Sequence, residues 1–160
     1  MKTNLVATLA ILLVAATGCN KSRTVETGDG TVQVTESSGT TQIEMESKEG
    51  KARLTASETA VAIPDTFPKD VPILKGAVAR MTMSQGKTEI LHLAIPQSVA
   101  EVTKDYQEKL KAEGWTIEST MNTGDGAMLH AKKDDRVCVL VIGKDEDSGG
   151  SGVQLSVTGK

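Results

Sequence analysis

Few side chains in this chain are of the types that perform chemistry, and they lie far apart in the sequence. The 160 residues include two histidines, His92 and His130, and two cysteines, Cys19 and Cys138. Neither histidine belongs to a His-Glu-x-x-His pair, and the chain has no Gly-x-Ser-x-Gly turn. The sequence therefore predicts no catalytic residue, no bound cofactor and no enzymatic activity.

A metal or small-ligand carrier is the alternative function that these residue types allow. Thioether and imidazole groups bind copper and related ions, and Met81 and Met83 lie upstream of His92 and His130. Methionine is also a flexible filler of protein cores, and this chain has only one Phe, one Tyr and one Trp. We therefore expect the methionines, including Met121 and Met128, to pack in the core, and we expect no metal site.

Composition and charge narrow the class of protein. The chain is 38% hydrophobic and 24% charged, as is typical of a globular protein. Its formal net charge is -3, and its basic residues are interspersed with acidic ones. Because binding to phosphates needs a clustered positive surface, nucleic acid is excluded as a partner.

The start of the chain has the organisation of an export signal. Lys2 precedes an apolar run at residues 5–16, and the small residues Thr17 and Gly18 lead to Cys19. A helix that spans a membrane needs about 20 apolar residues, so this run is too short for a permanent anchor. We expect residues 1–18 to be a signal peptide that is removed.

The tetrapeptide Ala16-Thr17-Gly18-Cys19 resembles the lipobox of bacterial lipoproteins, although Ala16 stands where Leu is usual. The resemblance implies cleavage before Cys19, palmitate or a similar lipid on that cysteine, and attachment to a membrane. Asn20 rather than aspartate follows the cysteine, which favours the outer membrane, on its periplasmic side. The alternative is an ordinary secreted protein in which Cys19 is a free or disulfide-bonded thiol.

The second cysteine lies in the most apolar run of the chain, residues 137–142. We expect Cys138 to be a buried thiol in a central strand that is apolar on both faces. Lipid on Cys19 would leave Cys138 without a partner in the chain. A disulfide between the two cysteines, formed in an oxidising compartment, is the competing arrangement.

The elements that must position these residues fall into distinct regions. Residues 19–23 are expected to be a short lipidated tether. In residues 24–60, apolar and polar residues alternate at 31–36, 41–46 and 51–56 with glycine turns between them, so we expect a small β-meander that acts as a spacer. Three prolines make residues 61–76 an extended linker, with Phe67 reaching into a core.

Residues 77–160 are expected to form an α+β domain. Two strands precede a helix that starts with a capping box, Ser98 and Glu101, and ends at Gly114. Four further strands follow, which gives the order β-β-α-β-β-β-β and a two-layer fold, an antiparallel sheet with one helix. The helix is expected to turn one apolar stripe toward the sheet: Val99, Val102, Tyr106 and Leu110.

Two motifs in the last hundred residues resemble a class of uncharacterised envelope lipoproteins. They are Phe-Pro-x-Asp-Val-Pro at residues 67–72 and Lys-Leu-Lys-x-x-Gly-Trp at residues 109–115. This resemblance implies no particular activity. Because the sequence contains no recognisable catalytic group, we expect a non-catalytic binding or scaffolding module. Its expected partners are the membrane, through lipid on Cys19, and an envelope protein.

Overall fold

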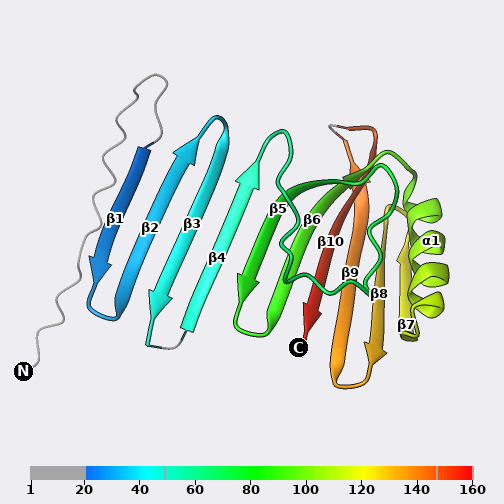
Figure 1. Cartoon of the computed structure of the whole chain (residues 1–160). Coiled ribbons are helices and arrows are strands. Elements are labelled where there is room, and N and C mark those ends of the chain that lie inside the picture. Colours follow the sequence, from blue (N-terminus) through cyan, green and yellow to red (C-terminus); the bar gives the residue numbers. More distant parts are fainter. Residues whose placement is uncertain (1–20, 49, 147, 160) are drawn as a thin grey trace, which may run out of the picture.

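The computed structural model describes residues 21–48, 50–146 and 148–159, which form one continuous antiparallel sheet and one helix (Figure 1). The signal peptide, the lipobox and Cys19 lie outside the described residues. The elements are β1 (Lys21–Thr27), β2 (Gly30–Ser37), β3 (Thr40–Ser47), β4 (Gly50–Ser57), β5 (Val78–Gln85), β6 (Thr88–Ile95), α1 (Val99–Ala112), β7 (Thr116–Thr123), β8 (Gly126–Lys133), β9 (Arg136–Asp145) and β10 (Gly150–Thr158).

The ten strands lie in the order β1-β2-β3-β4-β5-β6-β10-β9-β8-β7. The first six follow one another across the sheet. Helix α1 then carries the chain to the far edge at β7, and three hairpins bring it back until β10 pairs with β6. The expected class, an antiparallel sheet with one helix, is confirmed.

The separation of a meander from the α+β domain is wrong. Strand β4 pairs with β5, with Ala52 opposite Gln85 and Ala56 opposite Met81, so the N-terminal strands extend the same sheet. This pairing gives hydrogen-bond partners to backbone N–H and C=O groups of β4 and β5 that two separate sheets would leave unpaired at their edges. The N-terminal region also has four strands rather than three, because residues 21–23, expected as a tether, pair in β1 with residues 34–36 of β2.

Helix α1 begins and ends at the expected residues. The Ser98 hydroxyl accepts the Glu101 backbone N–H, and the Glu101 carboxylate accepts the Ser98 backbone N–H, which is a complete capping box. At the other end Gly114 has a φ of 84°, and the Trp115 N–H donates to the Leu110 carbonyl at 2.9 Å, which closes a Schellman motif. The helix therefore stops where Trp115 can turn into the core.

The core lies between one face of the C-terminal strands and a cover made of α1 and the segment of residues 58–77 (Figure 1). Cross-strand neighbours Leu91, Leu155, Leu140 and Leu129 form a buried row on this face, none more than 1% exposed. The expected helix stripe packs here, as do Phe67 and Trp115. We call this side of the sheet the helix side.

In the N-terminal strands the polarity of the two sides of the sheet is reversed: the helix side is polar and the other side is apolar. The same cross-strand row continues from Leu91 through Thr82 and Thr55 to Gln42, so the helix side becomes polar toward β3. On the other side, paired residues in β2 to β6 are apolar: Val34, Ile43, Leu54, Met83 and Ile90. The direction of amphipathicity therefore reverses along the sheet.

The expectation that the methionines pack in the core is wrong. Alternation places Thr82 in the core and turns Met81 and Met83 to the opposite side, while Met121 and Met128 are 64% and 45% exposed. The methionines are thus not core filler. Strand β9 is apolar on both faces, as expected, but only one face is buried, and Val141 on the other is 42% exposed.

Candidate functional groove

An open groove of about 940 Å³ lies on the helix side of the sheet, beside the segment that links β4 to β5. Its floor is the polar face of β3, β4 and β5, including Gln42, Thr55 and Ser84. Its wall is residues 60–66 of the linking segment. A volume of this size lies within the range of about 300–1,000 Å³ that is typical of small-molecule sites.

The floor and the wall differ in chemistry. On the floor, Arg53 and Glu44 form an ion pair at 2.6 Å between Nη2 and Oε1, with side chains 67% and 47% exposed. Because both side chains are this exposed, their charges are accessible to a ligand. The ion pair itself contributes little to stability. The wall is mostly apolar: Ala60, Val61, Ala62, Ile63 and Pro64. The groove can therefore receive a molecule that has both a polar and an apolar part.

Backbone contacts hold the wall in place. The Val61 N–H donates to the Ala79 carbonyl at 2.8 Å, which ties the wall to β5. The Arg80 guanidinium, at a β-bulge in the same strand, donates to the carbonyls of Glu58 and Thr59. Arg80 thus satisfies carbonyls that no strand would pair. The wall is fixed to the sheet at the start of the linking segment.

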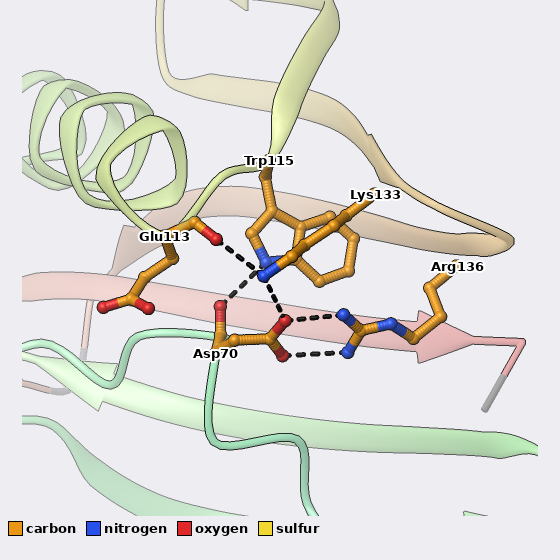
Figure 2. A network of polar contacts seen from close by, with 5 residues as sticks. All are labelled: Asp70, Glu113, Trp115, Lys133 and Arg136. Carbon is orange, nitrogen blue, oxygen red and sulfur yellow. Dashed lines mark hydrogen bonds and ion pairs between the residues drawn. The ribbon is translucent and has the colours of Figure 1, made fainter.

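Further along, the same segment is fastened by a polar network around Asp70 (Figure 2). The Arg136 guanidinium donates to both carboxylate oxygens of Asp70, at 2.8 and 2.5 Å, and Lys133 Nζ donates to Oδ2 at 2.7 Å. The Trp115 indole N–H donates to the Asp70 carbonyl at 2.7 Å. Lys133 also donates to the Glu113 carbonyl at the end of α1. We call these five residues the Asp70 clasp.

The charges of the clasp interact strongly with one another. The hydrogen bonds from Arg136, together with Lys133, hold the pKa of the Asp70 carboxyl far below its usual range, although partial burial opposes this. A carboxylate held this strongly in its charged form is a poor general base near neutral pH. Both motifs of the lipoprotein resemblance contribute, Asp70 from the first and Trp115 from the second, so they serve to join linker, helix and sheet.

The histidines and methionines do not form one site. His92 lies across from Met81 on the side away from the helix, half-buried, and burial lowers its pKa. His130 lies three strands away in β8, about 14 Å at the usual strand spacing, and its Nδ1 is 3.0 Å from the Glu118 carboxylate. Within the described residues, no three His, Cys, Asp or Glu side chains are grouped as a metal would require.

Cys138 is a buried thiol, as expected. It is fully buried on the helix side, and desolvation raises its pKa to about 12. It faces the same core as Tyr106, whose pKa burial also raises. The Tyr106 hydroxyl is a buried polar atom without a hydrogen-bond partner in the described part of the chain. The burial of Cys138 and its raised pKa suppress the reactivity of its thiol.

The groove and the clasp partners were not identified from the sequence. The motif at residues 67–72 pointed to Asp70, but nothing in the sequence marked Arg136 or Lys133 as its partners, because their closeness depends on the β8–β9 hairpin. Only a weak pattern in the sequence indicated the polar floor of the groove. Polar residues alternate regularly in residues 41–46 and 51–56, but such a pattern is also that of any solvent-facing strand.

A family model described as START domain-like matches residues 78–152, which hold β5 to β9, α1 and the start of β10. The match supports the sheet-plus-helix fold of this part and does not include β1 to β4 or the linking segment. No curated protein and no solved structure matches the chain. In the part of the chain that the structure describes, α1 does not have the length and apolar character required to cross a bilayer.

Proposed function

We propose that the protein is a non-catalytic binding module of the bacterial cell envelope, which is anchored by lipid on Cys19 and holds an amphipathic ligand in the groove. The observation that carries the proposal is the groove itself. Its floor offers accessible charges at Glu44 and Arg53, and its wall offers apolar side chains such as Val61 and Ile63. Such a combination of apolar surface and a few polar groups is typical of binding sites.

The proposed anchor would bring the groove close to a membrane surface. Strand β1 begins at Lys21, two residues after Cys19, and two extended residues span at most about 7 Å. Strands β3 and β4 lie two and three places from β1, which is about 10–15 Å at the usual spacing. A ligand exposed at the membrane surface or carried by an envelope protein would thus be within reach.

Photo-crosslinking in intact cells tests the groove. A photoreactive amino acid replaces Thr55 on the floor, and a control protein carries it at Lys111, which is exposed on α1. We expect an adduct, detected as a mass shift or a shifted band, from Thr55 and not from Lys111. Labelling at native expression that is equal at both positions, or absent at Thr55, contradicts the binding function.

The anchor is tested separately by fractionation. Cys19→Ala, or treatment with globomycin, should move the protein from the membrane fraction to the soluble fraction, because the covalent lipid is then absent. Cys138→Ala is the matched control and should stay with the membranes, since that thiol is buried in the core. Retention of Cys19→Ala on membranes would show that lipid on this residue is not the anchor.

A further inference from the structure

The side of the sheet opposite α1 carries an extended apolar surface, which we call the open face. It runs through paired residues of adjacent strands, from Val34 in β2 to Ile90 in β6. A second row holds Val25, Val32, Met45 and Ala52. In the C-terminal half, alternation adds three valines of β9 and two methionines: Val137, Val139, Val141, Met121 and Met128.

No described element covers the open face. Helix α1 and residues 58–77 both pack on the helix side. Large apolar side chains are accordingly exposed toward both edges of the sheet, with Val25 52%, Val141 42% and Met121 64% exposed. Between them, Gln154, Ser156 and Thr158 make the open face of β10 polar. Exposed apolar patches larger than a few hundred Å² are unusual on a monomer and typically mark an interface.

The N-terminal strands need such a cover most. Their helix side is polar, so the apolar residues of β1 to β4 have no core on either side among the residues that the structure describes. A sheet gains stability by burying its apolar face against a second layer. A partner layer on the open face would supply that core.

We propose that the open face packs against the open face of a second copy of this chain. The open face is large enough for such a dimer. Ten strands at about 4.8 Å spacing, with about eight residues per strand at about 3.3 Å rise, give the face an area of roughly 1,200 Å². A stable interface needs about 800 Å² per partner. The branched residues and methionines of the two faces would interdigitate as in a β-sandwich.

The positions of the apolar residues on the open face also fit a second copy. Val25, Val32 and Met45 lie toward its β1 end, and Val141, Met128 and Met121 lie toward its β7 end. A twofold axis parallel to the strands places the β1 end of one copy over the β7 end of the other. The apolar residues of β1 to β3 then lie over those of β7 to β9 of the second copy.

A second copy fits this face better than a bilayer does. Surfaces that lie in a membrane interface usually carry aromatic residues and a cationic rim. The single Trp and the single Tyr of this chain are buried on the helix side, at Trp115 and Tyr106. In the dimer both grooves would remain on the outer surfaces, so ligand binding and dimerisation are compatible.

The mass of the full chain in a mild detergent, measured by sedimentation, tests the dimer. Val25→Glu and Val141→Glu place charge on the open face at exposed positions, so the monomer fold should tolerate them. Thr24→Glu is the matched control, because the neighbouring residue of β1 points to the helix side. We expect two chains per particle for the unmodified protein and the control, and at least tenfold weaker association for both open-face variants.

Crosslinking in intact cells removes the influence of detergent. A photoreactive amino acid at Val25 should give an adduct that contains only this chain, at twice its mass, and the same group at Thr24 should not. A monomeric mass together with a lipid adduct at Val25 would overturn the proposal in favour of a membrane surface. An adduct with a different protein would also overturn the proposal. A dimer that persists in both open-face variants would overturn it as well, because it would indicate pairing at a strand edge.

Discussion

The Arg136 guanidinium lies between the Asp70 carboxylate and the Trp115 ring. It donates to both oxygens of Asp70, at 2.8 and 2.5 Å, and its Cζ lies 5.0 Å from the centroid of the indole. A planar guanidinium suits this double role, because its fork matches a carboxylate while its face stacks on an aromatic ring. The contact joins the linking segment to β9 and fixes the end of α1 beside both.

Removing either side of this contact should destabilise the protein. Asp70→Asn leaves Arg136 and Lys133, whose side chains are only 19% and 26% exposed, without their anion. We expect a loss of about 1–3 kcal/mol in the free energy of unfolding, measured with urea, which lies between the values of exposed and fully buried pairs. Asp135→Asn, an exposed carboxylate beside Arg136, is the control and should change little.

The same pair should make stability depend on acid pH. The cations lower the folded-state pKa of Asp70 below its ordinary value of 3.8. The resulting stabilisation is complete above that value and is lost as the pH falls through the folded-state pKa. The difference in unfolding free energy between the unmodified protein and Asp70→Asn should thus be constant from pH 7 to 5 and narrow below about pH 4. A difference that stays constant down to pH 3 would show that Asp70 does not titrate abnormally.

The sequence predicted local structure better than assembly. The cap at Ser98 and Glu101 and the stop at Gly114 depend on residues three or four positions apart, and both are confirmed. The pairing of β4 with β5 bridges the whole linking segment, so alternation within each strand could not reveal it. Alternation did show that each strand has an apolar face. It could not show which side of the sheet that face occupies, and the open face was therefore missed.

The thiol of Cys138 should be inert in the folded protein. It is fully buried, and burial raises its pKa to about 12, so almost none of the reactive thiolate is present at neutral pH. Iodoacetamide at pH 8 should leave the peptide that contains Cys138 unmodified, as measured by mass spectrometry. Addition of urea should make it react within minutes. Rapid labelling without urea would mean that the core opens readily around β9.

The hydroxyl of Tyr106 should cost stability rather than add to it. Tyr106 is fully buried on α1, and its hydroxyl lacks a hydrogen-bond partner among the described residues. Removing an unsatisfied polar atom while keeping the ring avoids its desolvation penalty, so Tyr106→Phe should stabilise by about 1 kcal/mol. Tyr106→Leu is a useful comparison, because it removes ring volume as well and should destabilise. A loss of stability in Tyr106→Phe would indicate that the hydroxyl is satisfied in solution.

The groove wall should depend on the packing of Phe67. This side chain is 4% exposed and follows directly after the wall, so it holds the linking segment against the core. Phe67→Leu should cost about 1–2 kcal/mol in unfolding free energy, because part of the ring volume is lost. It should also speed hydrogen exchange at the Val61 amide, whose bond to the Ala79 carbonyl fixes the wall. Lys69→Ala, an exposed change in the same segment, should leave both measurements unaltered. Unchanged exchange at Val61 in Phe67→Leu would mean that Arg80 and β5 hold the wall without help from the core.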